Sequence, residues 1–102
     1  MSTNPSARGE RLVADDVTVI VDPEHGGRLA SLVVGGRERL IGPPDPADGS
    51  VRWGSFLMAP WPGRLASGRL RWRGRTIQLE RTFGRHAIHG LVHGRPGTVT
   101  AA

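Results

Sequence analysis

The chain has 102 residues, of which 37% are hydrophobic, 15 are glycine and 8 are proline. This length suits one small domain with a thin core, and the abundant turn formers favour short strands over long helices. The sequence contains no cysteine, which excludes disulfides and Cys-ligated metals, and it has no apolar run of about 20 residues that could span a membrane.

The net charge of +5 rests on 14 basic residues, all of them arginine. An arginine-rich surface can bind anions, but a coding bias that replaces lysine by arginine gives the same composition. The spread of the arginines from Arg8 to Arg95, without a tight block, favours the bias. The polar N-terminus lacks the apolar segment of a signal peptide, so we expect a soluble, cytoplasmic protein.

The first half of the chain shows short β-strand patterns. Residues 1–12 are polar and predict a flexible lead-in. Residues 17–21 and 28–34 are rich in β-branched and aliphatic side chains and predict two strands. Gly35-Gly36 is a two-residue hairpin signal, after which residues 37–41 should return as a strand.

The second half begins with a loop and contains the clearest hairpin. Residues 42–50 are rich in Pro, Asp and Gly and predict a loop, and residues 51–58 predict a strand or an extended segment. Residues 68–79 alternate in polarity around Arg73-Gly74 and predict a hairpin with Leu70 opposite Ile77 and Trp72 on the same face. We expect Trp53 and Trp72 in the core, and very little helix.

Two clusters on either side of this hairpin carry a family resemblance. Residues 60–69 are Pro-Trp-Pro-Gly-Arg-Leu-Ala-Ser-Gly-Arg, and residues 87–92 are Ala-Ile-His-Gly-Leu-Val. In their amino-acid sequence and in their order along the chain, they resemble two sugar-binding signatures of the aldose 1-epimerase (mutarotase) family. The glycine-rich stretch at residues 22–32 and the Gly-Gly turn at 35–36 are similar to the opening of that family.

The resemblance implies a mainly β fold, a galactose mutarotase-like antiparallel β-sandwich of which this chain covers only the N-terminal part. We assign residues 1–12 to the lead-in, 13–96 to the sandwich and 97–102 to a tail. The tail departs from the family pattern where Trp usually follows Arg-Pro.

Three residues form the predicted site. The resemblance implies that His89 contacts the ring-oxygen side of a sugar and takes part in catalysis, a role that suits the pKa range of imidazole. It places Arg64 among the substrate-binding residues, where a guanidinium can donate to adjacent hydroxyls. The family has Asn where this chain has Gly63. Trp61 either stacks on the sugar or packs between its two flanking prolines, and we include it as substrate-binding.

The remaining histidines and the hairpin arginines could form other sites, but their spacing argues against it. The spacing of His86, His89 and His93 does not converge on one side of a strand or loop, and no carboxylate or cysteine lies near, so we predict no metal. His25 is expected in a turn. Hairpin alternation divides the arginines at residues 69–75 over two faces with a single interleaved Trp, so we predict no nucleic-acid partner, and no membrane partner either.

The resemblance implies an isomerase that interconverts the α and β anomers of an aldose by acid–base ring opening and closure, with no cofactor. The family supplies its base, a Glu, and a further acid, a His, from regions downstream of the His-Gly motif. We therefore expect residues 1–102 to be inactive alone. The alternative is a small non-catalytic β module that binds carbohydrate or an anionic partner; no oligomeric state is predicted.

Overall fold

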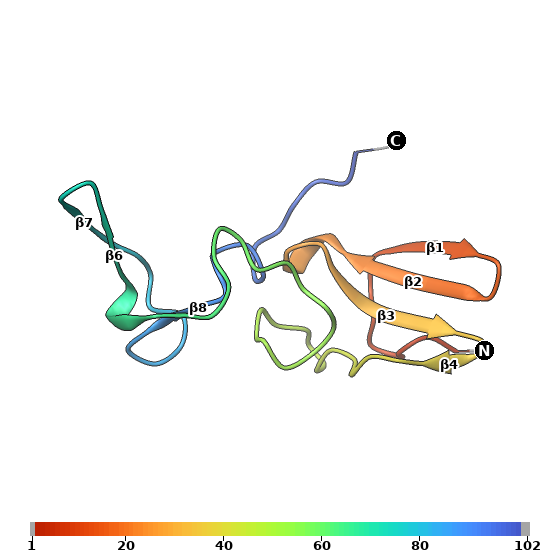
Figure 1. Ribbon diagram of the computed structural model, residues 1–102. Helices are drawn as coiled ribbons and strands as arrows, with labels where there is room; N and C mark the ends of the chain where they lie inside the picture. Colours follow the sequence, from red (N-terminus) through yellow and green to blue (C-terminus); the bar gives the residue numbers. More distant parts are fainter. Residues whose placement is uncertain (1, 101–102) are drawn as a thin grey trace. The chain divides into compact units, whose positions relative to one another are not determined.

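The computed structural model describes residues 2–100, which divide into two compact units (Figure 1). Of the described residues, one unit combines 2–57 with 92–100, and the other is Met58–Leu91. The only helical elements among residues 2–100 are two three-residue 3-10 turns, η1 (Pro23–His25) and η2 (Ala66–Gly68). The predicted mainly β, antiparallel character is confirmed, while the sandwich stays a prediction.

The first unit contains a four-stranded antiparallel sheet with the strands in chain order. Its strands are β1 (Glu10–Ala14), β2 (Val17–Asp22), β3 (Arg28–Val34) and β4 (Arg37–Glu38). The predictions of β2 and β3 are confirmed. Gly35 and Gly36 join β3 to β4 with φ values of 56° and 81°, which favour glycine and match the twist of a tight hairpin.

The N-terminal segment takes part in this sheet more than its composition suggests. Residues 10–12, within the expected lead-in, belong to β1, which pairs with β2 along its whole length. All five residues of β1 are exposed, so this edge strand lacks the alternation that identifies a half-buried strand. Asn4 also ties the segment down, because its side chain donates to Ala30 O at 2.9 Å.

The strand predicted for residues 37–41 ends early, at Glu38. The Glu38 carboxylate accepts hydrogen bonds from the backbone N–H groups of Arg39 and Leu40, both at 3.1 Å. It also accepts from the N–H of Leu32 at 2.9 Å and from the Ser31 hydroxyl. The carboxylate thus takes the N–H groups of Leu32 and Leu40, although the Arg39 N–H still donates to Leu32 O at 2.8 Å. Sequence periodicity does not reveal this side-chain competition with the ladder.

These bonds make stability depend on pH through Glu38. Burial alone would raise the pKa of its carboxyl, but the hydrogen bonds from Ser31, Leu32, Leu40 and Asn4 together lower the pKa below its ordinary value. Stabilisation is therefore complete above the unfolded-state pKa and is lost as pH falls through the lowered folded-state pKa.

We expect Glu38→Gln to lower the free energy of unfolding at neutral pH by about 1–3 kcal/mol. The difference from wild type should shrink as the solution is acidified below the ordinary glutamate pKa. Urea denaturation at a series of pH values measures both effects, with the exposed Glu24→Gln as the control. A Glu38→Gln deficit that persists unchanged in acid would contradict the assignment.

The core of the first unit is small. It consists of Ala7, Ile20, Ala30 and Trp53, with Ala47 packed against it. Trp53 is 2% exposed, so its prediction as a core residue is confirmed. Its segment, residues 51–58, is not a regular strand: it forms turns and one bridge, from Ser55 to Leu29.

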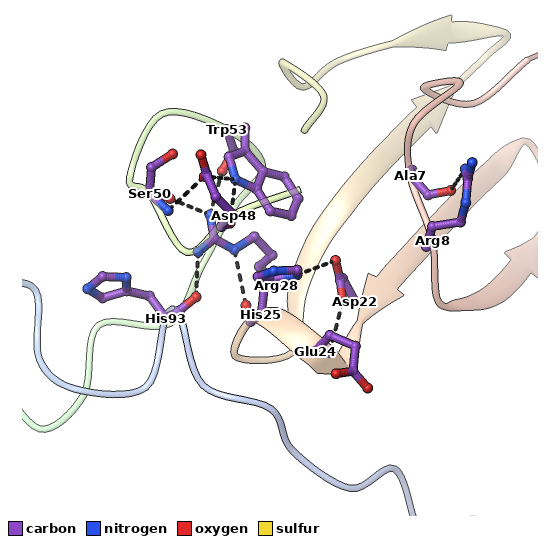
Figure 2. Close-up of polar contacts among 10 residues, drawn as sticks. All are labelled: Ala7, Arg8, Asp22, Glu24, His25, Arg28, Asp48, Ser50, Trp53 and His93. Carbon is purple, nitrogen blue, oxygen red and sulfur yellow. Dashed lines mark hydrogen bonds and ion pairs between the residues drawn. The ribbon is translucent and has the colours of Figure 1, made fainter. Parts of the chain in front are cut away.

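Arg28 is the buried cation of this unit, with 1% of its surface exposed (Figure 2). Its guanidinium donates to the carbonyl oxygens of Ser50 at 2.7 Å, of Trp53 at 3.2 Å, and of His25 and His93. Its Cζ lies 4.2 Å from the centroid of the Trp53 ring. Burial lowers the pKa of Arg28, while the carboxylates of Asp22 and Asp48 act in the opposite direction. One side chain thus joins three loops to the start of β3.

Met58–Leu91 contains two small antiparallel sheets. One pairs β5 (Arg64–Leu65) with β8 (Ala87–Ile88), and the other pairs β6 (Arg69–Trp72) with β7 (Arg75–Gln78). The predicted hairpin is confirmed, with Leu70 opposite Ile77 and positive φ at Arg73 and Gly74. The prediction that Trp72 is a core residue is wrong: 59% of it is exposed, because no second layer covers this hairpin within the described part of its unit.

Candidate functional site

The two family-like clusters lie side by side within Met58–Leu91. Arg64 of β5 pairs with Ile88 of β8, and Leu65 pairs with Ala87. Outside this ladder, Ala59 forms an isolated parallel bridge with Gly90, and the N–H of Leu91 donates to Ala59 O at 2.7 Å. Segments more than 20 residues apart in the sequence are therefore adjacent, and the hairpin β6–β7 connects them through η2.

His89 follows β8 and is held by Gly63 of the other cluster. Its N–H donates to Gly63 O at 2.9 Å, and the Gly63 N–H donates to His89 Nδ1 at 3.0 Å. In the neutral ring the proton then resides on Nε2, because Nδ1 acts as the acceptor. His89 is half-buried and has a φ of 55°, a left-handed conformation uncommon for a non-glycine residue. The Gly63 N–H thus fixes the tautomer of the neutral ring.

Gly63 leaves open space beside this histidine. Its φ is 74°, and a Cβ added there would meet no atom within 4 Å. Asparagine, which the family has at this position, is among the few residues that tolerate such a φ. The departure from the family pattern therefore removes an amide without changing the backbone.

Arg64 is exposed and lies on the rung of the ladder next to Gly63 and His89. Its Cζ is 5.3 Å from the centroid of the Phe83 ring, a cation–π distance that positions the guanidinium. The structure thus places Arg64 and His89 at the same end of one strand pair. A common cavity for their side chains stays a prediction.

Trp61 is half-buried, and its Nε1 is a buried donor without a hydrogen-bond acceptor among residues 2–100. Leaving such a group unsatisfied costs about 1–3 kcal/mol, so an unpaired buried donor requires an explanation. No sequence pattern distinguishes this Trp from a purely packing residue. Packing between the two flanking prolines and a polar role toward a ligand are therefore both consistent with its position.

The other histidines bind polar groups of the fold. His86 Nδ1 accepts from the Ser67 N–H at 2.9 Å, His93 Nδ1 donates to Gly49 O at 3.0 Å, and His25 lies 2.9 Å from an Asp22 oxygen. Within the described chain, no group of three histidine, cysteine or carboxylate side chains is placed to hold a metal ion. Over the same residues, no helix is long and apolar enough to cross a membrane.

Comparison with known proteins adds one match. The family model for aldose 1-epimerase matches residues 12–100, a range that includes both clusters, the hairpin between them and all of the four-stranded sheet except the first two residues of β1. No curated protein and no solved structure matches the chain. Because the family model extends over most of the sequence, the chain belongs to the aldose 1-epimerase family.

Proposed function

We propose that this chain provides the sugar-binding side of an aldose 1-epimerase site, with Arg64, His89 and Trp61 as its substrate-binding residues. The observation that carries the proposal is the pair of hydrogen bonds between Gly63 and His89. They join the two signature clusters and, because Nδ1 accepts, they place the proton of the neutral His89 ring on Nε2.

Each residue has a distinct role in this proposal. The Arg64 guanidinium offers several coplanar N–H donors, which suit two adjacent sugar hydroxyls. The Nε2–H of His89 donates to the ring oxygen and supports its protonation as the C1–O bond breaks. Trp61 offers an aromatic face and an N–H that has no acceptor among residues 2–100.

Anomer interconversion needs two further groups. A base takes the proton of the anomeric hydroxyl while an acid protonates the ring oxygen. The ring opens, the C1–C2 bond rotates, and reversal of the proton transfers closes the ring on the other face. By family resemblance the base is a Glu and the principal acid a His from downstream regions. Each such group contributes roughly 10²–10⁴-fold, so we propose that residues 1–102 bind sugar without useful catalysis.

For sugar binding, we expect Arg64→Ala and His89→Ala each to weaken the affinity for D-galactose or D-glucose by about tenfold or more, the loss expected for one charged or well-placed hydrogen bond. Amide chemical shifts in a sugar titration give the affinity. Arg85→Ala is the matched control, since Arg85 is an exposed arginine of the same unit. Gly63→Asn, which restores the family's amide, should tighten binding.

Polarimetry on freshly dissolved α-D-glucose tests the catalytic part of the proposal. The chain should match buffer. A clear acceleration that His89→Ala abolishes would show that residues 1–102 hold a complete catalytic apparatus. Equal sugar affinities for the Arg64→Ala and Arg85→Ala variants would contradict the proposed sugar-binding site.

A further inference from the structure

The positive charge of this chain is concentrated in one of its units. Met58–Leu91 contains seven arginines and a single acidic residue, Glu80. The remaining residues contain seven arginines and eight carboxylates, so they are close to neutral. Four of the seven arginines lie within the hairpin, at positions 69, 71, 73 and 75. The spread of arginines along the sequence therefore hides a local basic surface.

The hairpin has two different faces, and both are exposed. The register pairs Leu70 with Ile77 and Trp72 with Arg75 on one face, which is mainly apolar. The opposite face carries Arg69 and Arg71, together with Thr76 and Gln78. No salt bridge involves the hairpin arginines among residues 2–100, where the one recorded ion pair is His25–Asp22.

The outer edge of β7 is open. Within the described chain, β6 and β7 form a sheet of two strands only. The Leu79 N–H donates to Gly68 O at 2.7 Å, which makes this pair a hydrogen-bonded rung. Rungs alternate, so the backbone N–H and C=O groups of Thr76 and Gln78 face away from β6. An edge of this kind is a template for an added strand.

The arginine face also contains a hollow that can take side chains. A space of about 400 Å³ is lined by Ala66, Ser67, Arg69, Arg71 and Thr76. Two guanidinium groups and two hydroxyls are donors toward a carboxylate. The hollow lies beside the open edge, because Thr76 belongs to both.

We propose that the β7 edge binds an extended acidic segment of another protein by strand addition, with acidic and apolar residues alternating along that segment. Because the added strand would lie beside β7, its acidic side chains would share a face with Thr76 and Gln78 and would meet the long side chains of Arg69 and Arg71 across β7. Its apolar side chains would extend the face that carries Ile77. A second copy of this chain would bring seven arginines against seven, which opposes self-association. A single-stranded nucleic acid would find only Trp72 for stacking and would leave the apolar pair uncovered.

The test uses the full chain and a short fluorescent peptide that alternates glutamate with valine, with affinity measured by anisotropy. We expect the double substitution Arg69→Glu with Arg71→Glu to weaken binding at least about tenfold. Thr76→Pro should weaken binding by a similar factor, because it removes an outward N–H that the hairpin does not use. The control pair Arg37→Glu with Arg39→Glu makes the same charge change on exposed residues of the other unit and should leave affinity within about twofold.

Charge exchange gives a result that unfolding cannot imitate. The Arg69→Glu, Arg71→Glu variant should prefer a peptide that alternates lysine with valine, while the wild-type chain should reject it. Three results would overturn the proposal: equal binding of a scrambled acidic peptide, tighter binding of an oligothymidylate, or wild-type affinity in a Thr76→Pro variant with an unchanged circular dichroism spectrum. Dimerisation of the chain through this edge, detected by sedimentation, would overturn it as well.

Discussion

Replacing Arg28 by alanine should lower the free energy of unfolding by at least about 3 kcal/mol, because the substitution leaves buried polar groups without partners. Carbonyl oxygens of four residues accept from this guanidinium: His25, Ser50, Trp53 and His93. The loss also removes the cation from the faces of Trp53 and Phe56. The free energy of unfolding of a native domain is only about 5–15 kcal/mol in total. Because the core of this chain is small, the Arg28→Ala variant should be largely unfolded at moderate temperature.

Urea denaturation followed by tryptophan fluorescence measures the effect, since Trp53 packs directly on Arg28. Arg28→Lys should be intermediate, because an ammonium lacks the planar set of donors that reaches several carbonyls at once. The exposed Arg37→Ala is the control and should change stability by no more than about 0.5 kcal/mol. A loss for Arg28→Ala that is no larger than this control would refute the role assigned to the buried cation.

Replacing Gly90 by alanine should separate the two signature clusters. Gly90 has a φ of 77°, and a Cβ added there would lie 2.0 Å from Ala59 O and 2.3 Å from the Ala59 carbonyl carbon. These are backbone atoms that cannot rotate away, so the bridge between Ala59 and Gly90 must open. We expect the cost to exceed the roughly 1–2 kcal/mol of a left-handed alanine alone. Sugar binding should be lost with the pairing.

Hydrogen exchange at the Leu91 amide reports this pairing, because that amide donates to Ala59 O. The matched control is Gly74→Ala, which has a φ of 73° but no atom within 4 Å of the added Cβ. The Gly74→Ala variant should lose only the free energy that a left-handed alanine costs, and its Leu91 amide should stay protected. If Leu91 is equally protected in both variants, the close approach of Gly90 to Ala59 does not hold the clusters together.

Local patterns in the sequence determined several elements of this fold. Residues 17–21, residues 28–34 and the hairpin around Arg73-Gly74 were predictable because alternation and turn chemistry act over a few neighbouring residues. The two signature clusters identified the family in the same way, since their spelling is local. The sequence shows the order of the two clusters along the chain. That they pair, and that two hydrogen bonds join Gly63 to His89, is seen only in the structure.

Only the tertiary structure decided which of several identical residues are buried. Nothing near Arg28 in the sequence distinguishes it from the 13 other arginines, because three of its four acceptors, at Ser50, Trp53 and His93, are more than 20 residues away in the chain. Trp53 and Trp72 look alike in sequence, yet one packs in the core and the other lies on an uncovered hairpin. The early end of β4 likewise depends on where the Glu38 carboxylate meets backbone N–H groups. Burial and side-chain hydrogen bonding join residues far apart in the chain, so no local pattern records them.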